Sequence, residues 1–226
     1  MIQKIIRRLA FYRKIRFFKY LHLNYFCKGV IRMDQSRVIP YKNAVLELRP
    51  GAKIYLGGGD VEIGCDQLVG SKTETRVRLR EGAVWSNEGG CRLSYGTTLE
   101  VLQNATLYSR FFTMNSNCVL VAAKRITFGH DVMIGRGVVI YDSDHHTLRS
   151  GNQEVTNPDA PVVIGDHVWL ATNAMVLKGT TIGSGSMVAA NAVVHGAIGP
   201  NVIYQTTNVP KVRENYGMWS REHPVI

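Results

Sequence analysis

An aliphatic residue recurs at every sixth position in the last third of the chain. The set consists of Ile164, Leu170, Val176, Ile182, Val188 and Val194. A second set, mostly small or β-branched, follows four positions after each of these and consists of Val168, Ala174, Thr180, Ser186, Ala192 and Ile198. A period of six fits neither the 3.6-residue period of an amphipathic helix nor the two-residue period of a strand. It is typical of a hexapeptide β-helix, in which short strands alternate with corners.

The six-residue period also predicts which side chains stack. Three hexads complete one coil, so residues three hexads apart should lie above one another in the core. The predicted pairs are Ile164 with Ile182, Leu170 with Val188, and Val176 with Val194. One coil alone cannot bury its aliphatic column, so we expect the fold to be stabilised by stacking of neighbouring coils.

The same frame is visible earlier in the chain, at Phe128, Ile134 and Ile140, and is then interrupted until Ile164. Residues 36–128 have glycine-rich corners between apolar stretches and indicate less regular coils, so that residues 43–206 supply about eight coils in all. The interruption predicts an insertion at about residues 142–159. A long polar excursion from a solenoid is usually functional.

The basic residues are concentrated at the N-terminus. The chain has a formal net charge of +10, and residues 1–33 contain nine Lys or Arg residues and no acidic one. Aromatic and aliphatic residues lie between these bases, and neither glycine nor proline occurs in residues 1–28, which predicts one or two helices. Such a segment either contacts an anionic membrane, with its bases at the headgroups, or caps the end of the solenoid. It has no base-stacking motif, so we expect no nucleic-acid partner.

These patterns divide the chain into a basic, aromatic helical segment (1–35), a β-helix domain (36–206) and a C-terminal tail (207–226). The composition, with 45% hydrophobic and 19% charged residues, is that of a folded protein. The four cysteines have no metal-like spacing and indicate reduced thiols. No apolar run is long enough to span a bilayer. We therefore expect a cytoplasmic protein, either free or peripheral at the inner face of the membrane.

The phrase PVVIGDHVWLATNAMVLKGTTIGSGSMVAANAVV, residues 161–194, resembles the pattern PVxIGxxVWIGxxAxIxxGVxIGxxxxIGAxSVV of the left-handed β-helix, hexapeptide-repeat acyltransferases. It is most similar to galactoside and maltose type O-acetyltransferases and to enzymes that acetylate bacterial surface polysaccharides. The resemblance implies an all-β solenoid, a left-handed parallel β-helix with a protruding catalytic loop. It also implies a homotrimer, acetyl-CoA as co-substrate and a sugar hydroxyl as acceptor.

The candidate catalytic stretch is Tyr-Asp-Ser-Asp-His-His, residues 141–146, where the last regular strand enters the insertion. Histidine suits a general base because its unperturbed pKa is close to neutral pH. In the family the catalytic histidine lies on this loop, in phrases like TxxH or DSDxH, and the resemblance assigns this role to His145, with His146 as the nearest rival. Asp142, or alternatively Asp144, would orient the imidazole. The candidate acceptor-binding residues are Tyr141, Asp144, His146 and Arg149.

The resemblance also implies a binding site for the CoA arm along the corners of the last coils. The residues that match it are Trp169, Ala171, Thr172, Ala189, Ala190, Lys211 and Arg213. We predict no metal site, because the chain lacks the HxxxxH pair of the β-helical carbonic anhydrases and two adjacent histidines do not easily bind one ion. Two alternatives stay open: N-acetylation of an amino sugar, and a non-catalytic β-helix scaffold that would not need His145.

Overall fold

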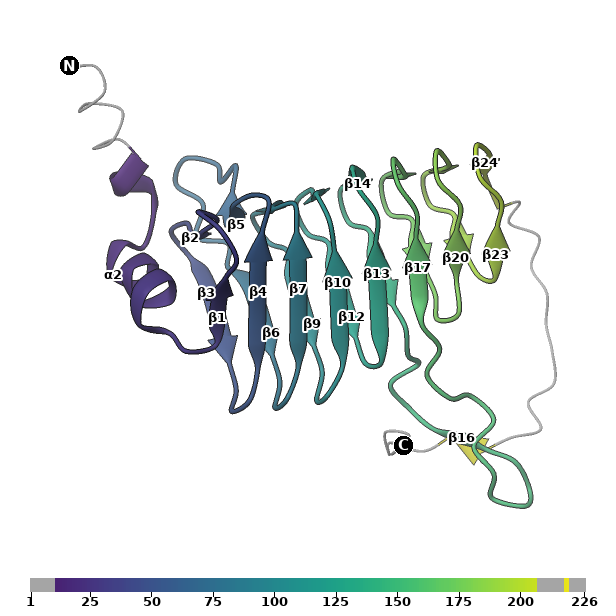
Figure 1. Ribbon diagram of the computed structural model, residues 1–226. Coiled ribbons are helices and arrows are strands. Elements are labelled where there is room, and N and C mark those ends of the chain that lie inside the picture. Colours follow the sequence, from purple (N-terminus) through teal and green to yellow (C-terminus); the bar gives the residue numbers. More distant parts are fainter. Residues whose placement is uncertain (1–10, 207–217, 220–226) are drawn as a thin grey trace.

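The computed structural model describes residues 11–206 and 218–219, and its strands stack into a long rod with a helical segment at one end (Figure 1). Three parallel sheets run along the rod. The chain passes from the first sheet to the second, then to the third, and back to the first one coil further on. This is the topology of a parallel β-helix.

Within the described residues, the first and second sheets have eight strands each and the third has seven. The first sheet contains β1 (Val30–Arg32), β4 (Lys53–Gly57), β7 (Val84–Glu88), β10 (Thr106–Ser109), β13 (Arg125–Phe128), β17 (Val162–Ile164), β20 (Thr181–Ile182) and β23 (Ala197–Ile198). The second sheet contains β2 (Val38–Pro40), β5 (Val61–Cys65), β8 (Cys91–Ser94), β11 (Phe112–Met114), β14 (Val132–Ile134), β18 (Trp169–Leu170), β21 (Met187–Val188) and β24 (Ile203–Tyr204). The third sheet contains β3 (Ala44–Leu48), β6 (Thr75–Leu79), β9 (Thr98–Val101), β12 (Val119–Ala122), β15 (Val139–Tyr141), β19 (Met175–Val176) and β22 (Val193–Val194). These counts agree with the predicted eight coils.

The predicted stacking of hexads is confirmed by the strand register. The observed partners are Ile164 and Ile182, Leu170 and Val188, and Val176 and Val194. All six side chains are no more than 1% exposed. The columns continue across the insertion, because Phe128 pairs with Ile164, Ile134 with Leu170 and Ile140 with Val176. The insertion therefore leaves the rod and returns to it without shifting the core.

The earlier coils are built on the same columns but differ in length. Ile54, Trp85, Leu107 and Ile126 follow one another in register in the first sheet, at separations that shorten along the chain. Trp85 is fully buried, and its indole N–H donates to Ser109 Oγ at 3.0 Å. The rod begins with β1 at Val30, ahead of the predicted domain boundary at residue 36.

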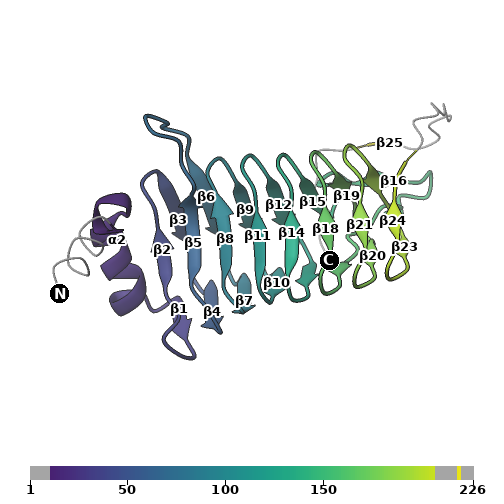
Figure 2. The same cartoon turned by 90° about the horizontal axis from the view of Figure 1, so that it is seen from above.

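The N-terminal segment forms α2 (Phe17–Leu21) and a π-helical turn, η1 (His22–Phe26), at the end of the rod (Figure 2). Leu23 is 2% exposed and belongs to the core of the rod. The Asn24 side-chain amide donates to Val38 O at 2.8 Å and accepts from Val38 N–H at 2.9 Å. It therefore provides hydrogen-bond partners for the backbone of β2, the first strand of the second sheet. The segment therefore caps the rod. Its outer face leaves Phe18 and Phe26 83% and 73% exposed.

Candidate active site

The insertion leaves the third sheet after β15 and rejoins the first sheet at β17, so it protrudes from the corner between these two sheets (Figure 1). Its outer part is a hairpin in which Arg149 and Val155 form an antiparallel bridge. The Thr156 N–H donates to Leu148 O at 2.9 Å, which closes the hairpin. β16 (Leu148–Arg149) also pairs with β25 (Met218–Trp219), a contact that the sequence did not predict.

The two loop histidines have different surroundings. His145 adopts a left-handed backbone conformation (φ 60°), and its N–H donates to Ser143 Oγ at 2.9 Å. Its ring, which is half-buried, packs edge-to-face on Tyr141 with ring centroids 5.1 Å apart. His146 is exposed, and its carbonyl oxygen accepts a hydrogen bond from the Asn157 amide at 2.8 Å. Tyr141 thus positions the His145 ring, while the backbone of His146 is fixed by Asn157.

The Asp142 carboxylate is buried and faces the preceding coil. It accepts backbone N–H bonds from Ala123 at 2.6 Å, Lys124 at 2.9 Å and Arg125 at 2.6 Å. Burial raises the pKa of the Asp142 carboxyl, although these three N–H groups act in the opposite direction. The carboxylate therefore fastens the start of the loop to the rod. These partners differ from the imidazole partner that the sequence suggested for Asp142.

Asp144 is exposed, and its carboxylate contacts two residues that hold the loop. It accepts a hydrogen bond from Lys178 Nζ at 2.6 Å and one from the Asn157 amide at 2.9 Å. Burial alone would raise the pKa of Asp144, but the hydrogen bonds from Lys178 and Asn157 and the nearby charges of Lys178 and His145 lower it below its usual value. The carboxylate therefore stays ionised at neutral pH and lies close to His145.

Asn157 and Lys178 brace this part of the loop. Asn157 is 8% exposed, and its side-chain oxygen accepts the Leu148 N–H at 2.6 Å. Lys178 follows β19 at the same corner one coil further on, and its ammonium also donates to Asn157 O at 2.8 Å. The lysine thus joins both halves of the loop to the rod. Neither residue was predicted from the sequence to belong to the site.

The predicted donor-side residues gather at a different edge of the rod. Trp169 is 42% exposed on the second sheet, in register with Met133 and Met187. The corners that follow β18 and β21 contain Ala171, Thr172, Ala189 and Ala190. These corners stack on successive coils, as the Ala171 N–H donates to Val188 O at 2.9 Å. They lie between the second and third sheets, whereas the histidine loop lies between the third and first. Lys211 and Arg213 are outside the described residues.

Arg149 belongs to the hairpin, where its guanidinium donates to Gln153 O at 2.9 Å. In the part of the chain that the structure describes, no group of three or more His, Cys, Asp or Glu side chains is placed to hold a metal ion. No helix of the described part is long and apolar enough to cross a membrane. The polar side chains that the structure describes on this loop include the two imidazoles and the Asp144 carboxylate.

The hexad region matches a known family. The family model described as "Bacterial transferase hexapeptide (six repeats)" matches residues 161–196. A protein of Schizosaccharomyces pombe that is named as an acetyltransferase is 30% identical over 146 residues, which cover 64% of this chain and 69% of that protein. This chain belongs to the hexapeptide-repeat acetyltransferases.

A second relative agrees with membership of this family, and a solved structure shares the fold. A protein of Escherichia coli named as an O-acetyl transferase of lipopolysaccharide biosynthesis is 34% identical over 100 residues, which cover 40% of this chain and 50% of that protein. The crystallographic structure of the polysialic acid O-acetyltransferase OatWY has a TM-score of 0.53 and 19% identity, and the match covers 81% of this chain and 93% of that one. The predicted family and its left-handed β-helix fold are confirmed.

Proposed function

We propose that this chain transfers an acetyl group from acetyl-CoA to a sugar hydroxyl, in a bacterial surface polysaccharide or its precursor. The supporting observation is the histidine pair on a loop that Lys178 and Asn157 brace against the rod of an acetyltransferase. We infer the class of acceptor from the E. coli relative, which is named for lipopolysaccharide biosynthesis. An imidazole with a carboxylate close to it suits direct acyl transfer between two substrates.

In the proposed step His145 takes the proton of the acceptor hydroxyl while the hydroxyl oxygen attacks the thioester carbonyl. A C–O bond forms, the C–S bond breaks, and the imidazolium returns its proton to the departing CoA sulfur, so that no acyl-enzyme arises. The edge of Tyr141 holds the ring in place, and Asp144 stabilises the imidazolium that forms. This transfers the orienting role from Asp142 to Asp144.

His146 is the alternative base. It is the more exposed of the two side chains, and a strict reading of the phrase DSDxH along residues 142–146 ends on it. Its side chain can reach an acceptor outside the loop without displacing Tyr141. The choice between the two histidines is decided by comparing their single variants.

The donor site and the histidine loop lie at different edges of one rod, so we propose that a neighbouring copy supplies one of them. Apolar side chains are exposed in register on two faces, with Met133 and Trp169 on the second sheet and Met175 and Val193 on the third. Two different faces pair in a heterologous manner, and such contacts give a closed ring when the rotation between neighbouring copies closes. A homotrimer that holds acetyl-CoA between adjacent rods, along Trp169 and the small corner residues, meets this requirement.

Replacing Met175 with aspartate is expected to dissociate the trimer, because a charge would be buried between two rods without a partner. Val163→Asp is the matched control, since Val163 is 37% exposed and Met175 is 36% exposed but Val163 lies among threonines on the first sheet. Sedimentation equilibrium should give three times the chain mass for the parent and the control, and a lower mass for Met175→Asp. An unchanged mass for that variant would exclude the third sheet from the interface.

The function is tested by following release of the CoA thiol from acetyl-CoA in the presence of neutral glycans, amino sugars and surface polysaccharides. We expect thiol release that depends on a hydroxyl acceptor and a product ester that mild alkali cleaves. An alkali-stable amide would indicate N-acetylation instead. Absence of turnover with every acceptor, in protein that is trimeric and folded, would favour a scaffold.

We also propose that the capped end of the rod contacts an anionic membrane surface, as the basic and aromatic N-terminal sequence suggested. The cap exposes Phe18 and Phe26, and no acidic residue occurs before Asp34. Deleting the segment would remove Leu23 and expose the core that it covers, so surface substitutions are the better test. Phe18→Ser with Phe26→Ser is expected to weaken cosedimentation with anionic vesicles without changing the melting temperature; unaltered cosedimentation would speak against this contact.

A further inference from the structure

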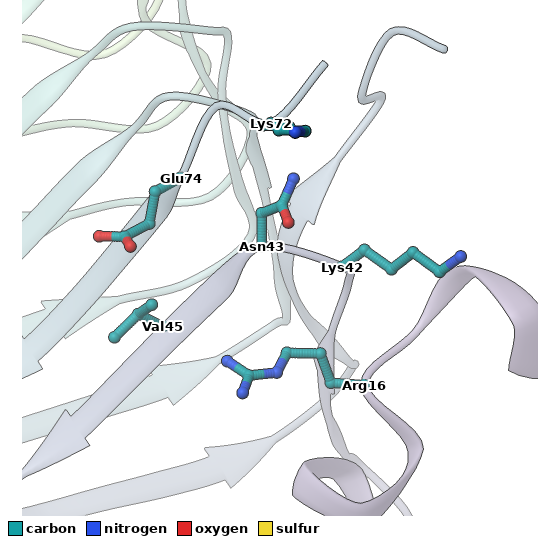
Figure 3. Close-up of a pocket in the computed structure, with 6 residues that line it drawn as sticks. All are labelled: Arg16, Lys42, Asn43, Val45, Lys72 and Glu74. Carbon is teal, nitrogen blue, oxygen red and sulfur yellow. The ribbon is translucent and has the colours of Figure 1, made fainter. Parts of the chain in front are cut away.

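A basic pocket lies at the capped end of the rod, far from the histidine loop. It has a volume of about 460 Å³ and is lined by Arg16, Lys42, Asn43, Val45, Lys72 and Glu74 (Figure 3). Three of these side chains are cationic. The one carboxylate, Glu74, forms an ion pair with Arg76, so the pocket carries an excess of positive charge.

The three bases come from three separate segments of the chain. Arg16 precedes α2, and its guanidinium donates to Ala44 O at 2.9 Å. Lys42 lies between β2 and β3, where its N–H donates to Lys14 O at 3.0 Å. Lys72 belongs to the loop between β5 and β6, which the Asn43 amide holds through Ser71 O at 3.3 Å. The pocket is therefore a product of the folded cap and the first coils, and no single basic stretch of sequence forms it.

The loop that carries Lys72 extends beyond the rod and ends in an apolar tip (Figure 2). The Ser71 N–H donates to Leu68 O at 3.0 Å, and Gly70 has a φ of +82°, which closes a tight turn. Leu68 and Val69 form its tip and are 64% and 105% exposed. Polar residues are the rule at such turns, so two exposed aliphatic side chains next to each other indicate an apolar environment outside the protein.

Exposed apolar side chains also occur in the cap, next to Arg16 in the sequence. Phe17 and Phe18, which follow Arg16, are 41% and 83% exposed. A surface that combines bases with exposed aromatic and aliphatic groups matches the boundary of a bilayer, where phosphates lie above the acyl chains. A soluble phosphate would gain nothing from the apolar groups.

We infer that this pocket binds the phosphate headgroups of anionic phospholipids, while Leu68, Val69 and Phe18 enter the acyl-chain boundary. This inference rests on the membrane contact proposed above and is independent of acetyl transfer. It assigns the lipid-facing role to Lys42 and Lys72, which lie outside the basic N-terminal segment. It also orients the rod, with the capped end toward the membrane and the histidine loop away from it.

The test is cosedimentation of the full chain with phosphatidylcholine vesicles that either contain or lack phosphatidylglycerol. The double variant Lys42→Gln, Lys72→Gln is compared with Lys53→Gln, Arg136→Gln, which removes two exposed charges elsewhere on the rod. We expect the pocket variant to lose about 30-fold in affinity for the anionic vesicles, or about fivefold for each base, and the control to retain most of it. Leu68→Ser with Val69→Ser should weaken binding to the same vesicles.

If the pocket and control variants bind the anionic vesicles equally well, the proposal that the pocket binds lipid phosphates is wrong. The proposed membrane contact of Phe18 and Phe26 would not be affected by that result. If the parent chain fails to bind anionic vesicles while it still acetylates a soluble glycan, both membrane proposals fail and the enzymatic one does not. Inorganic phosphate is the competitor. If it displaces the protein from vesicles at the phosphate concentration of the lipid, the pocket is a site for free anions and the lipid assignment is wrong.

Discussion

Replacing His145 with alanine is expected to lower kcat for acetyl transfer by about 10²–10⁴-fold, the range that a general base contributes. The loss should appear in kcat rather than KM, because the imidazole acts on the proton that moves during attack on the thioester. The measurement is CoA thiol release at saturating acetyl-CoA and acceptor. The mass of the assembly in solution and the melting temperature should stay close to those of the parent, since His145 is half-buried in a loop outside the core.

His146→Ala is the matched control, one residue along the same loop. With His145 as the base, this variant should retain most of kcat and raise the acceptor KM. The reverse pattern would move the base to His146 and leave Tyr141 to fix His145 as a structural neighbour. If neither single variant loses more than about tenfold, the loop does not supply the base and the proposed step is contradicted.

Replacing Lys178 with methionine is expected to lower kcat by about 10- to 100-fold, because displacement of a reacting group by about 1 Å can cost that much. The ammonium holds both Asp144 and the Asn157 carbonyl, and its side chain is only 17% exposed. Without it the loop loses a link to the rod. The Asp144 carboxylate then acts on the nearby imidazole without a competing cation, so the acidic limb of the pH–rate profile should move to higher pH.

The pH profile separates this positioning role from simple loss of structure. Lys178→Arg keeps the positive charge and should recover part of kcat together with the parent profile, and Lys53→Met, at an exposed position on the first sheet, should resemble the parent. An unshifted acidic limb in Lys178→Met, with kcat reduced only in proportion to folded protein, would show that the lysine merely stabilises the loop.

The later coils could be predicted from the sequence because each hexad there corresponds to one strand and one corner. Ile164, Leu170 and Val176 fix the frame, and no loop interrupts it until the end of the repeat. The earlier coils contain the same core columns, but these could not be predicted from the sequence. The segments between Ile54, Trp85 and Leu107 differ in length, so the aliphatic residues no longer recur at a fixed spacing. Trp85 also needs Ser109 to satisfy its indole N–H, and a hydrophobic pattern does not predict such a partner.

The histidine loop could be predicted from the sequence, but the contacts of Lys178 and Asn157 that hold it against the rod could not. Lys178 is 34 residues from Asp144 and contacts it only because the insertion returns to the rod one coil before that corner. Asn157 lies in a stretch of polar residues with nothing to mark it as the buried centre of the loop. In the N-terminal segment, composition alone does not tell Leu23, which faces the core, from Phe18, which faces outward.

Acetyl-CoA labelled in its acetyl group, incubated with the purified protein and a hydroxyl-bearing glycan, provides the most direct measurement. Direct transfer predicts that the label appears in the glycan as an alkali-labile ester, in amounts equal to the CoA released, and that the protein itself stays unlabelled. Label that accumulates on the protein, or that remains wholly in acetyl-CoA with every hydroxyl acceptor tried, would contradict a base-assisted transfer between two bound substrates.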